Sequence, residues 1–210
     1  MEYRTLFQAL SGLLEAGAFA LLVKRIVQLK NSNGISRYLV HFSILITLSN
    51  LLLDFSLSFN LFVSIVKIIT LIILEYMMTK YPSKGAKFDD KHSSLFTLII
   101  VAAILSLPVL IYNNLSSFYQ SVTIIIDGLL IFCQLLLSKR SQNTSHFNLP
   151  FLVLLTASRI FKFLYLGFLA FHLRGPLMWS SWVSAMISNL STIDFVFLVR
   201  SLSGAPDLPL

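Results

Sequence analysis

Several charged residues lie inside the long apolar stretches of this sequence. A charge in such a stretch is expected to have a functional role or a partner of opposite charge. A charge at the centre of a membrane helix costs roughly 2.5–3.5 kcal/mol, so such residues usually pair with one another or face a water-filled cavity. The chemistry that this pattern predicts is ion pairing or the binding of a charged ligand. The residues are Glu15, Lys67, Glu75, Asp127, Arg159, Lys162 and Asp194.

Motifs for catalysis are not found in the sequence. It contains no Gly-rich phosphate loop, no nucleophile elbow and no His or Cys cluster with the spacing of a metal site. We therefore expect a protein that is not an enzyme, with no catalytic residues, no cofactor and no metal.

The composition indicates a membrane protein. Of the 210 residues, 56% are hydrophobic and 12% are charged, whereas a soluble domain has about 45–50% apolar and about 25% charged residues. The net charge is +7, but the basic residues cluster in loops between apolar runs. This favours a role in membrane topology over nucleic-acid binding, with membrane lipid as the surrounding partner.

Seven apolar runs are long enough to cross a bilayer as helices. The sequence therefore predicts an all-α membrane protein with a single seven-helix domain over residues 1–210. The predicted helices lie near 5–27, 35–57, 59–79, 94–113, 116–138, 149–172 and 177–200.

The loops between these runs differ in charge. Eleven of the 16 Lys and Arg residues flank spans on one face, two (Arg4 and Arg174) lie on the other, and three fall within spans. Because basic loops stay in the cytosol, we predict a lumenal N-terminus and a cytosolic C-terminus.

Depth along the spans predicts partners for the intramembrane charges. Asp127 lies near mid-depth in the fifth span, and the sixth span carries Arg159 and Lys162 at a similar depth. We expect Asp127 to pair with Arg159, with Lys162 as the alternative, and Glu15 to meet Lys67. Such pairs either fix helix register or line a polar cavity entered from the lumen, and both interpretations stay open.

Two further acids lie nearer the cytosolic ends of their spans. They are Glu75 in the third span and Asp194 in the seventh. Both capping of the cavity floor and extension of the side chain toward the interface are compatible with these positions.

The order of several short motifs resembles the ER lumen protein-retaining receptors, also called KDEL receptors. The resemblance covers the whole chain, with seven spans and the same predicted orientation. It is carried by YRTL at 3–6, GIS at 34–36, Lys67, the segment IIIDGLLIFCQLLLSKR with Asp127, Gln134, Ser138 and Lys139, SHFNLPF at 145–151 and DFVFL at 194–198.

The resemblance implies a fold and a function. The fold is two three-helix bundles joined by the fourth span, as in SWEET and PQ-loop carriers. The function is binding of the C-terminal tetrapeptide of escaped ER proteins and their return from the Golgi to the ER, with COPI and COPII coat components as partners and the ER and Golgi membranes as location. A SWEET-like small-solute carrier is the alternative.

The resemblance also assigns roles to residues. Arg4, Lys67, Asp127 and Arg159 match charged positions of the family, while Asn50 and Ser117 stand where the family has a carboxylate-binding arginine and an acid. The predicted ligand-binding residues are therefore Arg4, Asn50, Lys67, Ser117, Asp127 and Arg159, and the predicted structural charges are Glu15, Lys162 and Asp194.

Other positions depart from the family pattern. Ala170 replaces a sixth-span arginine, Gly12 stands at or near the histidine linked to pH dependence, and the tail SLSGAPDLPL has no dilysine. Either the peptide is less acidic than Lys-Asp-Glu-Leu, or it binds in a shifted register on Lys67 or Arg159. We expect a pH dependence weaker than that of the family, arising from His41, His172 or Glu15.

Overall fold

The computed structural model describes residues 2–53, 59–82, 95–112, 115–141, 144–172 and 176–202. Every regular element within these ranges is an α-helix, so the prediction of an all-α protein with seven helices is confirmed. Within these ranges the predicted and observed bounds differ by only a few residues, and the predicted bounds at 57, 94 and 113 lie outside the described residues. The helices are α1 (Glu2–Leu29), α2 (Arg37–Leu53), α3 (Phe59–Lys80), α4 (Leu95–Tyr112), α5 (Leu115–Ser141), α6 (Leu149–His172) and α7 (Pro176–Leu202).

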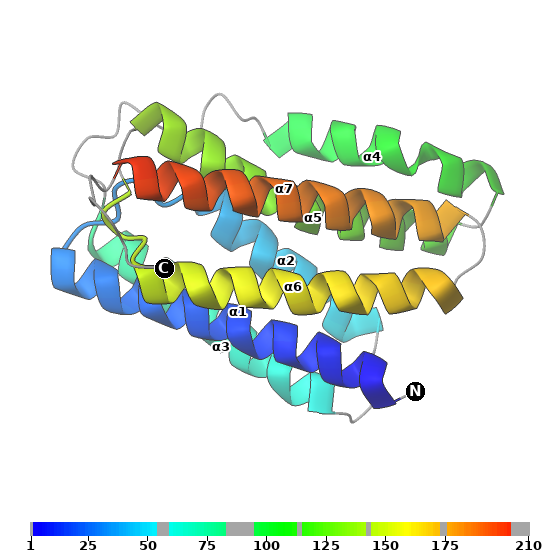
Figure 1. Cartoon of the computed structure of the whole chain (residues 1–210), viewed down its shortest axis with the longest axis horizontal. Helices are drawn as coiled ribbons and strands as arrows, with labels where there is room; N and C mark the ends of the chain where they lie inside the picture. Colours follow the sequence, from blue (N-terminus) through cyan, green and yellow to red (C-terminus); the bar gives the residue numbers. More distant parts are fainter. Residues whose placement is uncertain are drawn as a thin grey trace.

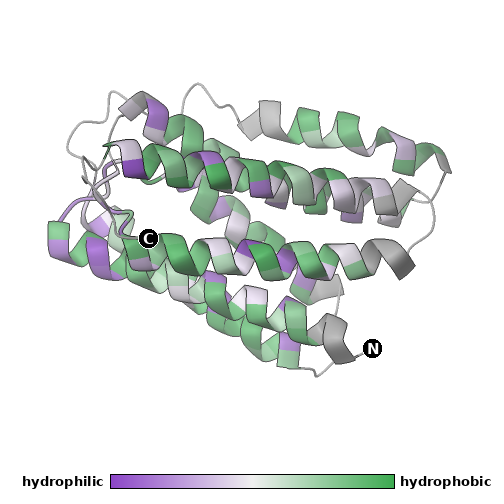
Figure 2. Cartoon of the chain, in the orientation of Figure 1, coloured by the Kyte–Doolittle hydropathy of each residue, from purple (hydrophilic) through white to green (hydrophobic). Residues whose placement is uncertain are grey.

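Five of these helices are long and apolar enough to cross a bilayer. Their outward faces carry large apolar side chains, such as the exposed Phe62, Leu190 and Phe197, and the apolar colouring runs over most of each ribbon (Figure 2). In water such faces would be costly, whereas in lipid they cost nothing. The exposed apolar surface therefore suits the hydrocarbon region of a membrane.

Six of the helices are grouped here by chain order and contacts into two triads, α1 to α3 and α5 to α7. In Figure 1 α4, α5 and α7 lie above α2, and α1, α3 and α6 lie below it. In the first triad α3 packs on α1 and α2, and in the second triad α7 packs on α5 and α6. The triads meet where α1 contacts α6 and α2 contacts α5, while α4 packs against α5 and α7 on the outside of the second triad. This is the pair of bundles that the resemblance implies.

Small residues allow the closest helix contacts. A Cβ atom added at Gly128 of α5 would lie 2.8 Å from the backbone oxygen of Ser184 in α7. Ser184 itself donates a hydrogen bond of 2.6 Å to the carbonyl of Ile124. Close approach of backbones is the usual means of helix association in lipid, where apolar burial gives no driving force. The second triad is therefore held tightly beside Asp127.

The helix ends have ordinary caps. Ser36 Oγ accepts a hydrogen bond from the backbone N–H of Leu39 at the start of α2. Asn148 Oδ1 accepts one from Phe151 at the start of α6. Each cap satisfies an amide that the helix itself leaves without a partner. Both caps lie at the same end of the bundle, and they fix where α2 and α6 begin after the loops that precede them.

Candidate functional site

A cavity of about 470 Å³ lies between the two triads and is lined by side chains of α1, α2, α3, α5 and α6. Its size falls within the usual range of about 300–1,000 Å³ for small-molecule sites. The lining residues lie toward one end of the bundle, where α1, α3 and α5 begin and α2 and α6 end. We call this the entry end, and the opposite end the closed end.

Four charged residues form the deep part of the cavity, which we call the floor. At about 1.5 Å per residue, they lie about 12–20 Å from the entry ends of their helices. All four side chains are mostly buried, and each reaches the cavity from a different helix. The floor consists of Glu15, Lys67, Asp127 and Lys162.

Four amide side chains form the shallow part of the cavity, which we call the mouth. They lie within about 9 Å of the entry ends of their helices, counted along the helix axis. Two of them are joined across α1 and α3, because Asn60 Nδ2 donates a hydrogen bond of 3.2 Å to Gln8 Oε1. The mouth consists of Gln8, Asn50, Asn60 and Gln120.

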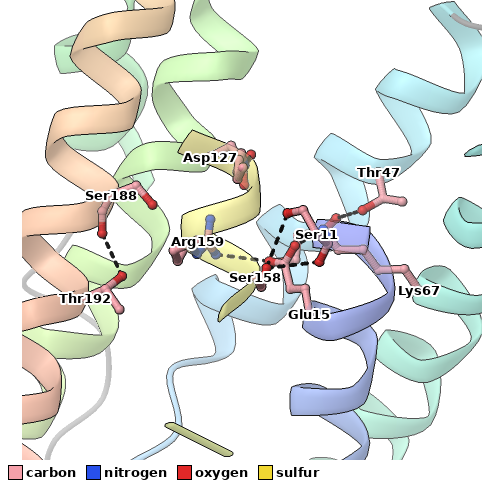
Figure 3. Close-up of polar contacts among 11 residues, drawn as sticks. Ser11, Glu15, Thr47, Lys67, Asp127, Ser158, Arg159, Ser188 and Thr192 are labelled. Carbon is pink, nitrogen blue, oxygen red and sulfur yellow. Dashed lines mark hydrogen bonds and ion pairs between the residues drawn. The ribbon is translucent and has the colours of Figure 1, made fainter. Parts of the chain in front are cut away.

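Glu15 joins three helices. Its Oε2 lies 2.7 Å from Lys67 Nζ in α3, and its Oε1 lies 3.1 Å from Arg159 Nη2 in α6. Figure 3 shows both cations reaching Glu15 from opposite sides. The expected meeting of Glu15 with Lys67 is thus confirmed. The carboxylate ties both triads together at the level of the floor.

Asp127 pairs with Lys162, the alternative partner, and the expected pair of Asp127 with Arg159 is wrong. The reason lies in helix order. α6 packs mainly on α1 and α7, so the cavity separates its inner face from α5. The long ammonium side chain of Lys162 extends into that space and reaches Asp127, whereas Arg159 points toward α1 and Glu15.

Arg159 lies behind the cavity and does not line it. Its side chain is 1% exposed, and its Nε and Nη1 atoms have no hydrogen-bond partner among the described residues. The neighbouring Ser158 donates a hydrogen bond of 3.0 Å to the backbone oxygen of Ser11 in α1. Arg159 therefore acts in this structure as a buried partner of Glu15, in contact with the cavity only through that carboxylate.

The remaining predicted ligand-binding residues are distributed unevenly. Asn50 lines the mouth. Ser117 lies half-buried in the first turn of α5 and is not among the cavity-lining residues. Arg4 belongs to the first turn of α1, but its side chain lies outside the described residues, and so does that of Ala170. The structure thus brings Asn50, Lys67 and Asp127 together around one space.

The two acids nearer the closed end stand apart from the cavity. Glu75 Oε1 lies 3.2 Å from His41 Nε2, and the exposed fractions of the two side chains are 27% and 48%. Asp194 is exposed on α7. Neither acid lines the cavity, so the interpretation in which they cap its floor is not supported.

Gly12 lines the cavity at a point where α1 and α3 come close. A Cβ atom there would lie 2.7 Å from Val63 Cγ1. Any side chain at this position requires Val63 to move. The cavity lining contains no histidine among the described residues, which agrees with the departure seen in the sequence.

Sequence reasoning missed three of the four mouth amides. A signal for them exists, because polar residues follow one another at helical spacing and end on the floor charges. Three helices show this pattern, each with one polar face toward the cavity. The stripes are Gln8, Ser11 and Glu15 in α1; Asn60, Ser64 and Lys67 in α3; and Gln120, Thr123 and Asp127 in α5.

The closed end is fastened by Gln134 of α5. Its Nε2 donates to the carbonyl of Gly34 at 2.7 Å and to Ser138 Oγ at 3.0 Å, and its Oε1 accepts from the backbone N–H of Ser36 at 2.9 Å. Gly34 has a φ of 84°, a conformation that glycine adopts without strain. One buried side chain thus attaches the loop between α1 and α2 to the second triad.

His146, in the loop between α5 and α6, makes a second attachment. Its Nε2 lies 2.8 Å from the carbonyl oxygen of Asn31, to which it donates as a neutral ring. Burial lowers the pKa of His146 below its ordinary value, and the hydrogen bond to Asn31 opposes that shift only in part. The loop between α1 and α2 and the loop between α5 and α6 are therefore bonded to each other in the neutral state of this histidine.

Comparison with known families decides what kind of protein this is. The model of the ER lumen protein retaining receptor matches residues 31–168, well over half of the chain. The chain belongs to the ER lumen protein retaining receptor family. A comparison with curated proteins finds no match.

Membership of this family gives the general function of the chain. ER lumen protein retaining receptors are multi-pass membrane proteins of the ER and Golgi, and they are not enzymes. They retrieve lumenal ER proteins by binding the retention signals at their C-termini. The predicted function is thereby confirmed at the level of the family. The matched region begins after α1, so it includes Lys67, Asp127 and Arg159 but not Glu15.

Proposed function

We propose that this receptor binds the C-terminal retention signal in the cavity between the two triads. The observation that carries the proposal is a space of about 470 Å³ with charges at its floor and amides at its mouth. An extended tetrapeptide spans about 13 Å, and the floor lies about 12–20 Å below the entry end. A peptide that enters by its C-terminus therefore fits the depth of the cavity.

The entry end faces the lumen in this proposal. Among the described residues, eight Lys and Arg residues flank helices at the closed end, and one, Arg4, stands at the entry end. The excess of basic residues is typical of the cytosolic side. A retention signal is presented in the lumen, so this orientation gives it access to the mouth. The N-terminus is then lumenal and the C-terminus cytosolic.

The closed end supports a receptor over a carrier. A solute carrier with two triads must open alternately toward each side. Here Gln134 and His146 bond the loops of the closed end across the two triads. Opening toward the cytosol would leave these buried polar groups without partners, at a cost of about 1–3 kcal/mol for each group.

Coat components of the COPI and COPII types complete the proposal. They would meet the cytosolic surface, which in this orientation is the closed end with its basic residues. Lys24, Lys30 and Arg37 lie there around the loop between α1 and α2. Loss of COPI recruitment after replacement of these three by Ala, with the protein still folded, is the expected result.

The binding proposal is tested with the purified full-length protein. Fluorescent peptides that end in acidic or uncharged tetrapeptides are titrated at pH 5.5 and pH 7.4, and solute uptake is measured in vesicles that contain only this protein. We expect saturable peptide binding whose affinity changes less than about tenfold between the two pH values, because the described lining holds no histidine. Solute flux without peptide binding would move the protein to the carrier class.

Arg4 belongs to the same proposal as a ligand contact at the mouth. It stands in the first turn of α1 at the entry end, where the proposed lumenal orientation disfavours a basic residue that has no function. A guanidinium binds a carboxylate or a peptide carbonyl through two donors. Arg4→Ala should weaken peptide binding about 10–150-fold. Arg37→Ala, at the closed end, is the matched control and should bind normally.

A further inference from the structure

An ionisable pair lies on the outer surface of the first triad, away from the cavity. It joins α2 to α3, because His41 Nε2 lies 3.2 Å from Glu75 Oε1. Neither residue lines the cavity, so the binding of a retention signal makes no use of them. Ionisable residues are costly where a helix faces lipid, and a pair that is kept there usually marks a functional site.

The pair lies near one boundary of the membrane. His41 comes four residues after the first residue of α2, and Glu75 comes five residues before the last residue of α3. At about 1.5 Å per residue, both lie about 6–8 Å from the closed end of the bundle. The 22 residues of α3 match a hydrocarbon core of about 30 Å. The pair is therefore placed just below the lipid headgroups.

The imidazole is the more accessible member of the pair. The side chain of His41 is 48% exposed, whereas Glu75 Oε2 is buried and has no hydrogen-bond partner among the described residues. The carboxylate therefore turns inward. When the ring of His41 is protonated, Nε2 donates to Glu75 and Nδ1 has a second proton to donate. The accessible side of the pair thus suits an anion.

Two further cations lie between the pair and the closed end. Arg37 comes one turn before His41 on α2. Lys80 comes five residues after Glu75 on α3. Both side chains are exposed, and the pair holds their helices together, so Arg37 and Lys80 lie at a similar height on neighbouring helices. Arginine and lysine side chains are the usual donors to phosphate oxygens.

Apolar side chains continue from the pair toward the centre of the membrane. Leu45 lies one turn after His41, and Ile72 lies about one turn before Glu75. Both are more than half exposed, and so is Tyr76, at the level where aromatic rings meet headgroups. From the closed end inward, the order is cations, an aromatic ring and apolar side chains. A phospholipid has the matching order of phosphate and acyl chains.

We infer that Arg37, His41 and Lys80 bind the phosphate of an anionic phospholipid. Its acyl chains lie along Leu45 and Ile72. In the proposed orientation this lipid belongs to the cytosolic leaflet, where anionic headgroups attract basic residues. Arg37 is also one of the residues proposed to meet the coat, so the two roles are separated by testing the receptor without coat proteins.

Native mass spectrometry of the purified full-length receptor tests the inference. The protein is placed at pH 7.0 in detergent micelles with equal amounts of phosphatidylglycerol and phosphatidylcholine, and the ratio of the two lipids retained on it is measured. We expect phosphatidylglycerol to be retained at least about fivefold more often, because each basic residue near anionic headgroups adds about a fivefold preference. Equal retention of the two lipids overturns the inference.

Four variants test the location of the site. Arg37→Gln combined with His41→Gln should reduce the preference to less than about twofold. Arg200→Gln removes the same charge from an exposed position at the same end of α7, in the second triad, and should keep the preference. His41→Gln alone should lower it, whereas His41→Arg keeps a cation beside Glu75 and should not. An undiminished preference in the double variant, or an equal loss in Arg200→Gln, overturns the assignment.

The same spectra identify the occupant of the site. An excess of inorganic phosphate should leave phosphatidylglycerol bound, because the acyl chains also contact the protein. Complete displacement would assign the site to free phosphate and overturn the lipid. A receptor dimer that forms without lipid and is lost in the double variant would assign this surface to a second copy of the chain, and it would also overturn the inference.

Discussion

At the entry end a cavity opens between the two triads, which touch beside it where Phe7 stacks on Phe168 and Ser49 bonds to Tyr119. At the closed end buried hydrogen bonds join the triads. The entry end places charges and amides where a ligand can reach them. The closed end uses the same kinds of residue, an amide and a histidine, but buries them against backbone groups. Polar residues inside this membrane protein therefore have two uses. Those at the entry end are open to a ligand, whereas those at the closed end are bonded to the backbone and stabilise the fold.

The difference also has an energetic side. A buried polar group stabilises the fold only when its hydrogen-bond or ion-pair partner is present. Removing one member of a pair therefore costs most when the other member stays buried without a partner. Floor residues pair with side chains, so both partners are open to substitution. At the closed end Gln134 pairs largely with backbone groups, which no substitution removes. Four substitutions test this contrast, from the largest expected effect to the smallest.

Glu15→Gln should cause the largest loss of stability. It leaves Lys67 and Arg159 as buried cations without their carboxylate, which typically costs about 3–5 kcal/mol. The measurement is the thermal midpoint of the purified protein in detergent. Glu75→Gln is the matched control: it removes an acid from a half-exposed pair with His41, and it should cost less than about 1 kcal/mol. Equal effects in both variants would contradict the central place of Glu15.

Asp127→Asn should cost about 2–4 kcal/mol, because Lys162 is left without its partner in the cavity. The double variant Asp127→Asn with Lys162→Met should recover part of this loss. Asp127→Asn with Arg159→Met should be worse than either single variant, since it also removes a partner of Glu15. Recovery in the second double variant alone would show that Arg159, and not Lys162, pairs with Asp127.

Gln134→Leu should cost about 2–3 kcal/mol by removing three hydrogen bonds at the closed end. The carbonyl of Gly34 and the N–H of Ser36 remain behind, and no second substitution can restore the loss. Gln28→Leu replaces an exposed glutamine and should change the thermal midpoint little. Added solute flux in Gln134→Leu would indicate that these bonds also keep the closed end shut.

The sequence predicts where the helices of this protein lie in the chain better than it predicts which helices and side chains contact one another. The long apolar runs predict the seven helices, and the depth of residues along the spans was enough to predict the pair of Glu15 with Lys67. Depth was not enough to choose between Arg159 and Lys162, which are three residues apart on α6. Their separate partners depend on how α6 is rotated between α1 and the cavity, and that rotation is set by packing among non-adjacent helices.

The mouth was harder to predict for a different reason. Uncharged amides carry little cost within a membrane helix compared with charges, so Gln8, Asn60 and Gln120 do not stand out singly. Only their helical spacing from the floor charges marks them. The amide of Gln134 also stands at helical spacing, seven residues after Asp127, but its partners Gly34 and Ser36 lie about a hundred residues away in the chain. Its structural role therefore becomes visible only in three dimensions.

His146 gives the smallest effect, and it is a difference in pH dependence. Its pKa is lowered in the folded protein by burial, so at a pH below the ordinary value of 6.5 the unfolded chain binds a proton that the folded chain resists. The stability that this residue contributes is present above about pH 6.5 and is lost as the pH falls toward its lowered folded pKa. The fall in thermal midpoint between pH 7.4 and pH 5.5 should therefore be smaller in His146→Gln than in the natural sequence, by the equivalent of less than about 1 kcal/mol. Leu202→Ala changes an exposed residue at the same end of the bundle, leaves His146 and its partners in place, and should keep the full fall. An unchanged fall in His146→Gln would show that His146 is not the source of the acid sensitivity.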